Sequence, residues 1–214
     1  MPRPARISRD QIAAAALALA DRDGLDAVSM RAVAAALGVG TMSLYNHVRN
    51  KADLERLLLD AATAPSASAA APRGSWEARA KAALRSIRSA LERHPGVVPL
   101  LLKRPTTSEA ALQPIEALLA ALRDGGFAGT ALLRAYHVLF GFLTGFVLTD
   151  LTGTLATRRG RSVSEVAAAV AGLDAARFPN LTACAKLAGR AKPGEEFEYG
   201  LDAVLAGLRA VEKL

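Results

Sequence analysis

Proline is absent from residues 5–64, and only Gly24, Gly38 and Gly40 interrupt this stretch. Proline breaks helices and glycine weakens them, so a proline-free segment with three glycines favours short helices joined by glycine turns. No convincing run of alternating apolar and polar residues, which would indicate strands, occurs in the sequence. We therefore predict an all-α chain.

Four helices are predicted within this stretch, at residues 9–22, 30–37 and 42–47 and from residue 51 onward. The residue before each helix has a side chain that can accept a hydrogen bond from the first free N–H groups of the helix. The glycines around Val39 favour a tight turn between the second and third helices, because glycine tolerates positive φ. The candidate N-caps are Ser8, Ser29, Thr41 and Asn50.

The remainder of the chain is predicted to form a larger helical bundle. Residues 62–74 are rich in Ala, Ser and Pro, and we interpret them as a linker between domains at 1–61 and 75–214. Further helices are expected at 75–93, 97–102, 108–123, 128–155, 164–173, 180–188 and 194–211.

Composition excludes several classes of protein. The single cysteine, Cys184, rules out an intrachain disulfide or a zinc site built on cysteines. The three histidines lie in separate segments without ligand spacing, and no nucleophile motif is present, so neither an enzyme nor a metal or cofactor site is predicted.

The N-terminus lacks the apolar segment of a secretory signal, and the most apolar run, Val138–Leu148, is shorter than the roughly 20 residues that span a bilayer. We expect a cytoplasmic protein that does not bind membranes.

The formal net charge is +7, which is compatible with an acidic partner such as nucleic acid. Residues 1–64 together contribute only +1, from eight basic and seven acidic residues. Residues 1–9 nevertheless contain Arg3, Arg6 and Arg9 and no acid. Within the N-terminal part, only this short arm points to nucleic acid by its charge.

Two short helices joined by a glycine-containing turn are typical of a helix-turn-helix, whose second helix enters the DNA major groove. The first turn of residues 42–47 would offer hydroxyl groups and a methionine to base edges, and Asn46 has the groups to read adenine. Lys51, next to a helix N-terminus, is well placed for a phosphate. The predicted DNA contacts are Arg31, Thr41, Met42, Ser43, Tyr45, Asn46, His47 and Lys51. The alternative is a polar helix face in an ordinary bundle, as in a structural or adaptor protein without sequence-specific DNA binding.

Residues 31–51 resemble the TetR family of repressors strongly, and the correspondence extends from Ile12 to Leu58. It includes Gly24, the Leu37-Gly38-Val39 turn, Leu44-Tyr45, His47-Val48 and Asn50-Lys51. The resemblance implies an N-terminal helix-turn-helix DNA-binding domain and a C-terminal helical bundle for ligand binding and dimerisation. It further implies a homodimer that binds a palindromic double-stranded DNA operator and releases it when a small molecule binds.

The C-terminal half resembles the subgroup with a tetracycline-repressor-like C-terminal domain. The resemblance rests on His94, Arg104-Pro105-Thr106, Gly126-Phe127, residues 145–150 and residues 197–202. Five positions depart from the polar residues that bind the drug or its magnesium in that subgroup. They are Leu100, Thr149, Ala83, Leu118 and, approximately, Ala67. Because a hydrated magnesium chelate needs hard or imidazole ligands, we expect no tetracycline–magnesium binding and a largely apolar effector instead.

An apolar effector would need a pocket between the C-terminal helices. The expected lining is Ile87, Leu91, Leu100, Arg104, Leu118, Leu122, Leu133, Tyr136, His137 and Phe140. Taken singly, these leucines are equally compatible with an ordinary core.

Two features suggest a dimer interface. One is the Gly141–Gly145 pair, which permits close helix approach, although such a pair also serves tight packing within a core. The other is the apolar stripe Phe197, Leu201, Val204, Leu205 and Leu208.

Overall fold

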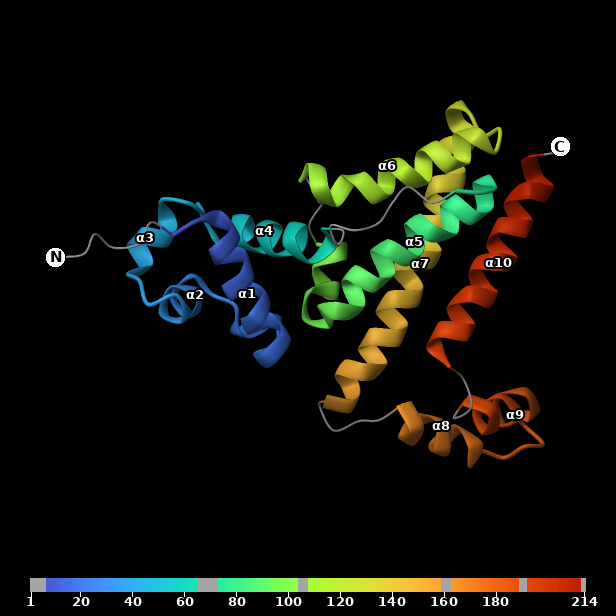
Figure 1. Cartoon of the computed structure of the whole chain (residues 1–214). Coiled ribbons are helices and arrows are strands. Elements are labelled where there is room, and N and C mark those ends of the chain that lie inside the picture. The colour runs from blue at the N-terminus through green and yellow to red at the C-terminus, as the bar shows by residue number, and fades with distance from the viewer. Residues whose placement is uncertain (1–6, 65–72, 104–107, 159–162, 189–191, 213–214) are drawn as a thin grey trace. The chain divides into compact units, whose positions relative to one another are not determined.

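The computed structural model describes residues 7–64, 73–103, 108–158, 163–188 and 192–212 (Figure 1). All regular elements in these ranges are helical, in agreement with the predicted all-α class. The chain divides into two compact units, Met1–Leu132 and Leu133–Leu214, which are described separately below. Most of the predicted linker at 62–74 lies outside the described residues, so the boundary between residues 61 and 75 stays a prediction.

The first unit contains six α-helices and two 3₁₀ segments in its described residues. In chain order they are α1 (Arg9–Asp23), η1 (Leu25–Ala27), α2 (Met30–Ala36), α3 (Thr41–Tyr45), α4 (Lys51–Thr63), α5 (Trp76–Arg93), η2 (Pro95–Leu102) and α6 (Glu109–Asp124). The helix starts agree with the predictions to within two residues.

Three of the four predicted N-caps in this unit are confirmed. Ser8 and Gln11 form a reciprocal capping box, in which each side chain bonds the other residue's backbone N–H. Ser29 caps α2 and Asn50 caps α4. Thr41 was expected to be the cap of the third helix, and this is wrong: Gly40 holds the cap position, and Thr41 is the first helical residue.

Short segments depart most from the sequence prediction. The helix expected at 97–102 is a 3₁₀ segment that begins at Pro95 and contains Pro99, whose missing N–H disfavours an α-helix. The third helix ends at Tyr45 instead of residue 47, and η1 was not foreseen. Such pieces are only a few residues long, so an apolar repeat of 3.6 residues recurs too few times in them to define where they begin and end.

One hydrophobic core joins the N-terminal helices to η2. Leu44 after the turn, Leu54 and Leu58 on α4, and Val97 and Leu100 on η2 all belong to one buried cluster, with Ile12 and other residues of α1. Each fully buried leucine contributes about 1.5–3 kcal/mol relative to exposure. η2 is therefore part of the same packed body as the N-terminal helices.

The helices α5 and α6 pack along each other within the first unit. Trp76 at the start of α5 lies edge-to-face with Phe127, with 5.6 Å between ring centroids. Gly125 makes this possible, since a Cβ there would stand 2.7 Å from the Trp76 ring. A bulky aromatic pair thus closes one end of the α5–α6 hairpin.

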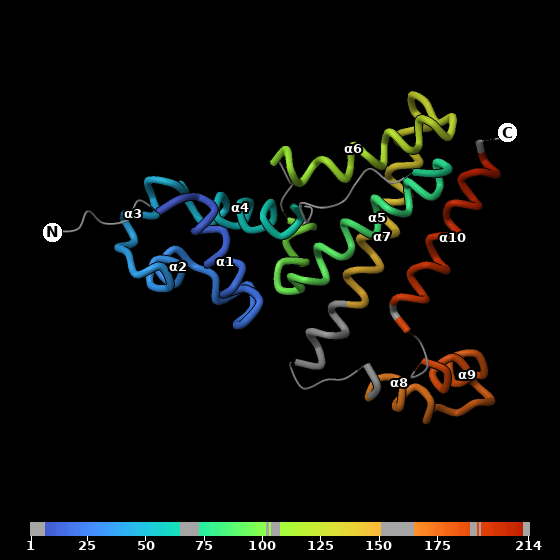
Figure 2. Tube along the Cα trace, in the orientation of Figure 1, coloured from blue at the N-terminus to red at the C-terminus, as the bar shows by residue number. Residues whose placement is uncertain are grey.

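The second unit holds most of α7 (Gly129–Arg158), α8 (Val163–Ala171), α9 (Pro179–Ala188) and α10 (Pro193–Glu212). The helices α8 and α9 lie side by side, as the tube in Figure 2 also shows. Phe197 of α10 is fully buried, with its ring 5.5 Å from that of Phe142 and 5.2 Å from that of Phe146. This aromatic cluster fastens α10 to α7, and Gly200 gives Phe142 the room it needs.

The segment Gly129–Asp150 of α7 is long and apolar enough to cross a membrane by length and composition alone, and 22% of its apolar window is buried within the chain. This span is longer than the run Val138–Leu148 that was expected to be too short for a bilayer, so that expectation needs correction, although one such helix is weak evidence for a membrane protein.

Candidate nucleic-acid interface

The helices α2 and α3 form a helix-turn-helix around a left-handed glycine. Gly38 has φ +66°, a conformation that side chains disfavour, and Val39 N–H then bonds the Ala34 carbonyl at 3.0 Å. Leu44 and Val48 are both fully buried. Leu44 anchors one face of α3 and Val48 anchors the chain just beyond its end, whereas Met42 and Tyr45 of α3 are exposed.

None of the predicted DNA contacts is buried in the structure. Met42 is 76% exposed, which is unusual for a large apolar side chain, and Tyr45 is also exposed. Thr41, Ser43 and His47 are half-buried, whereas Asn46, Arg31 and Lys51 are exposed. An exposed methionine at the first turn of a short helix is stabilised when another surface covers it, because its apolar side chain is then removed from water.

The N-terminus of α4 follows directly and is doubly capped. Asn50 Oδ1 accepts a hydrogen bond from Asp53 N–H at 2.9 Å, and Asp53 Oδ2 accepts one from Arg49 N–H at 3.1 Å. Lys51 is the first residue of α4, where the partial positive charge of the helix end also favours an anion. The candidate phosphate contact therefore sits on a rigid helix start.

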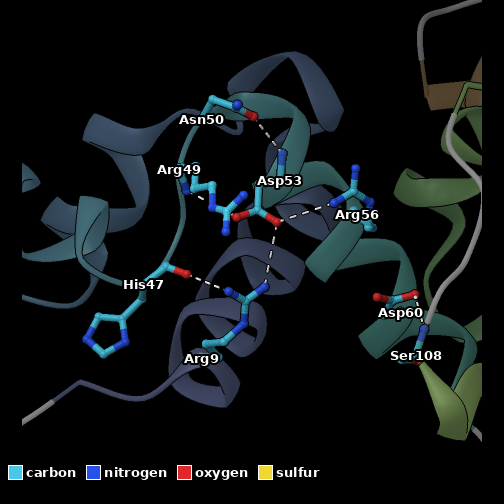
Figure 3. A network of polar contacts seen from close by, with 8 residues as sticks. All are labelled: Arg9, His47, Arg49, Asn50, Asp53, Arg56, Asp60 and Ser108. Atoms are coloured by element: carbon cyan, nitrogen blue, oxygen red, sulfur yellow. Dashed lines mark hydrogen bonds and ion pairs between the residues drawn. The ribbon is translucent and has the colours of Figure 1, made fainter.

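Arg9 links three elements in this region (Figure 3). Its Nη1 donates to the carbonyl oxygen of His47 at 2.6 Å, and its Nη2 lies 3.7 Å from Asp53 Oδ1. Arg56 approaches the same Asp53 oxygen at 3.6 Å. These side chains surround a polar hollow of about 380 Å³, lined by Arg9, Arg49, Asn50, Ala52, Asp53 and Arg56.

Sequence reasoning missed this role of Arg9. The sequence groups it with Arg3 and Arg6 as a basic arm, and those two residues lie outside the described residues. The acceptor carbonyl is 38 residues away, and no local pattern marks it.

Three contacts connect the helix-turn-helix core to later elements of the first unit. His94 Nδ1 lies 2.8 Å from Asp21 Oδ2 on α1. Asp60 Oδ1 on α4 accepts a hydrogen bond from Ser108 N–H at 3.3 Å, at the start of α6 (Figure 3). The backbone of Gly96 lies directly against the Ala20 carbonyl. Motions of η2 or α6 would therefore reach α1 and α4 through direct contacts.

The predicted effector residues of the first unit are mostly buried. Ile87 and Leu91 on α5, and Leu118 and Leu122 on α6, are buried between these helices and their neighbours. Leu100 is fully buried in the N-terminal core cluster. Arg104 lies outside the described residues.

The remaining predicted effector residues belong to the second unit. Tyr136 and Phe140 are half-buried with stacked rings 5.5 Å apart, whereas Leu133 and His137 are exposed. Burial raises the pKa of the Tyr136 phenol above its ordinary value, because the charged phenolate is disfavoured away from water. Because the ten residues are divided between two units, a common pocket stays a prediction.

No cluster of three or more His, Cys, Asp or Glu side chains that could hold a metal ion occurs among the described residues.

Two family models match the chain. Residues 12–56 match the bacterial regulatory proteins of the tetR family, and residues 68–212 match the tetracyclin repressor-like C-terminal domain.

Named relatives share this assignment. The chain is 35% identical to the HTH-type transcriptional repressor DrrR1 of Streptomyces coeruleorubidus over 159 residues, which is 74% of this chain but only 58% of that relative's length. It is 32% identical to the class E tetracycline repressor protein of Escherichia coli, covering 68% of this chain and 70% of the repressor.

Among solved structures, the TetR family protein ActR of Streptomyces coelicolor superposes closely. The apo form gives a TM-score of 0.81 at 28% identity, covering 99% of both chains. ActR in complex with actinorhodin gives a TM-score of 0.80 at 28% identity, covering 96% of this chain and 97% of ActR. The chain therefore belongs to the TetR family, as a helix-turn-helix transcriptional regulator with a tetracyclin repressor-like C-terminal domain.

Proposed function

We propose that this regulator is a repressor that binds a palindromic DNA operator as a homodimer in the cytoplasm and is released by a small, largely apolar molecule. The observation that carries the DNA-binding part is the exposed first turn of α3, held by the buried Leu44 and Val48. The alternative of a structural or adaptor bundle gives no reason for Met42 to stand in water beside a capped helix start.

In this proposal the predicted DNA contacts, which are exposed or half-buried, divide by role. Thr41, Met42 and Ser43 read base edges, since they occupy the first turn of the helix that enters the groove. Tyr45, Asn46 and His47 extend the contact along the same helix end. Lys51 contacts a phosphate, which positions the motif without reading sequence, and Arg31 reaches either a guanine or a phosphate.

A palindromic site requires two recognition helices related by a two-fold axis, about 34–36 Å apart. One apolar side of α7 supports such a dimer: Val138 is 48% exposed, and a Cβ at Gly141 or Gly145 would meet open space. A second copy of the chain would remove this surface from water.

The apolar stripe of α10 was expected to form part of the dimer interface, and this expectation needs correction. Phe197, Leu201 and Leu205 are buried inside the chain, so they are not available to a partner subunit. Their hydrophobic spacing reflects packing within the second unit. The other two residues of the stripe, Val204 and Leu208, are half-buried, and the large apolar residues that α10 leaves exposed are Tyr199 and Val211.

The proposal of a small-molecule effector draws on ActR, which was solved in complexes with actinorhodin and with (S)-DNPA. Its apolar character follows from Leu100, Leu118 and Ala83, which stand where the tetracycline-binding members carry polar groups. A ligand can release DNA only if it binds the released conformation more tightly than the DNA-bound one.

A selection from random DNA tests the proposal. The full-length protein is incubated with a library of about 30 random base pairs, and the enriched duplex is compared with a scrambled duplex by fluorescence anisotropy. Specific regulators prefer their site by about 10³-fold or more at moderate salt. An enriched palindrome with such a ratio is expected, whereas equal affinity for both duplexes would favour the adaptor alternative.

A further inference from the structure

We infer that Arg9 is a positioning residue for sequence readout: its guanidinium bridges the carbonyl of His47 and the carboxylate of Asp53 and thereby sets the orientation of α3 against α4. The inference rests on the proposed DNA binding and deepens it, because it places a determinant of specificity on a residue that itself contacts no base.

The recognition helix needs such support because it is short. Thr41–Tyr45 makes little more than one turn, and its N-cap Gly40 offers no side-chain hydrogen bond. Its inner face is held by Leu44 and Val48. Burial of these apolar side chains anchors the inner side of α3, but it gives no hydrogen-bond partner to the free carbonyl groups at the C-terminal end of the helix.

Arg9 supplies a directional contact at the C-terminal end of this helix. The hydrogen bond from Nη1 to His47 O measures 2.6 Å, and it satisfies a carbonyl just beyond the last helical residue. The same guanidinium reaches Asp53 at 3.7 Å, and Asp53 is tied to the backbone of Arg49 in the chain between the two helices. One planar side chain of α1 thus connects the end of α3 with the beginning of α4 (Figure 3).

The geometry also argues against a simple phosphate contact. Arg9 lies opposite an acidic side chain that is only 16% exposed, so part of its positive charge is compensated within the protein. Its Nη1 donates to the His47 carbonyl and its Nη2 lies 3.7 Å from the Asp53 carboxylate, so a phosphate at either of these nitrogens would compete with a partner inside the protein. A phosphate contact and a positioning role therefore predict opposite responses to substitution.

Three variants separate these roles. Arg9→Lys keeps the charge, but a single ammonium lacks the planar fork that spans two acceptors. Arg9→Gln removes the charge. Asp53→Asn removes the ion pairs with Arg9 and Arg56, yet its amide oxygen can still accept a hydrogen bond from Arg49 N–H and so preserve the start of α4. Arg22→Gln is the matched control, because Arg22 lies at the opposite end of α1 and pairs with Asp23.

The affinity of each variant is measured by fluorescence anisotropy for two duplexes, the one enriched by the unmodified full-length chain and its scrambled counterpart. The measurements cover a range of salt concentrations, at a temperature below the melting temperature of that variant. For Arg9→Lys and Asp53→Asn we expect the ratio of the two affinities to fall about tenfold, which is the scale of one good base contact. Affinity for the scrambled duplex should be unchanged in Arg9→Lys and higher in Asp53→Asn, which removes a negative charge. In the double variant Arg9→Gln/Asp53→Asn, the ratio of the two affinities should fall no further than in the single variant with the larger effect.

The opposite pattern would overturn the inference. If Arg9 contacts a phosphate, Arg9→Lys keeps the ratio of the two affinities. Arg9→Gln then weakens binding to both duplexes equally and lowers the slope of log affinity against log salt concentration by about 0.9. Additive effects of Arg9→Gln and Asp53→Asn would likewise contradict a bridge. Failure of the selection to enrich any duplex would instead contradict DNA recognition itself, so the two failures are distinguishable.

Discussion

The backbone of Gly96 packs against the carbonyl group of Ala20, so closely that a Cβ atom at position 96 would stand 2.9 Å from the Ala20 carbonyl carbon. This contact brings η2, which carries Val97 and Leu100, onto the last part of α1. Neither backbone can yield easily, because Ala20 is inside a helix and Gly96 follows the proline that begins η2.

We therefore expect Gly96→Ala to destabilise the protein by about 1–3 kcal/mol, the usual cost of forcing an extra methyl group into a packed site. Chemical denaturation at fixed protein concentration measures this change. Gly207→Ala is the control, since a Cβ at that position of α10 meets open space and alanine favours a helix. Equal stability of both variants would show that η2 is not packed on α1 as described.

Lys51→Ala should weaken binding to every DNA sequence to a similar extent. The side chain is exposed at the first residue of α4, and in the proposed interface it would neutralise a phosphate without reading a base. Removal of one phosphate contact lowers the slope of log affinity against log salt concentration by about one unit. An unchanged slope in salt-dependent anisotropy measurements would place Lys51 outside the interface.

Substitutions in the first turn of α3 should change which sequence is preferred. Ser43→Ala removes a hydroxyl and Met42→Ala an exposed apolar side chain, so each alters the contact offered to one base pair. A repeat of the random-library selection with each variant should enrich a duplex that differs at one or two symmetric positions. Arg22→Gln serves again as the control and should select the original sequence.

Val138→Glu should convert a dimer into a monomer. The side chain is exposed on the apolar side of α7, and a carboxylate there would have to be buried without a partner in the dimer. Light scattering at micromolar concentration measures the mass. Leu112→Glu on α6 is a matched substitution of an exposed apolar residue and should leave the mass unchanged. A wild-type monomer that binds a palindrome tightly would contradict the proposed assembly.

Calorimetry with tetracycline and magnesium should detect no tight binding, because leucine and alanine side chains cannot ligate the metal or hydrogen-bond the drug. Phe140→Ala should abolish the response to the true effector while DNA affinity is retained. Phe140 is preferred to Leu100 for this test, because Leu100 is fully buried in the core that supports the helix-turn-helix. Tight binding of the tetracycline–magnesium chelate would show that the apolar pocket is assigned wrongly.

The sequence by itself determined the helical class, the order of the helices and most of their starts. These are local properties: Ser8, Ser29 and Asn50 cap the nearest free N–H groups, and the periodicity within each helix defines its buried side. The exposed residues of the helix-turn-helix were predictable for the same reason, since Leu44 and Val48 face inward within a single short segment.

Tertiary structure alone decided which distant residues meet. Arg9 reaches a carbonyl 38 residues away, and His94 reaches Asp21 across 73 residues. Phe197 and Leu201 looked like an interface stripe, because an apolar helix face has the same spacing whether a partner or its own chain covers it. Helix propensity and capping act over a few residues, whereas the choice of neighbour depends on how whole helices pack, and that information is not contained in any local pattern.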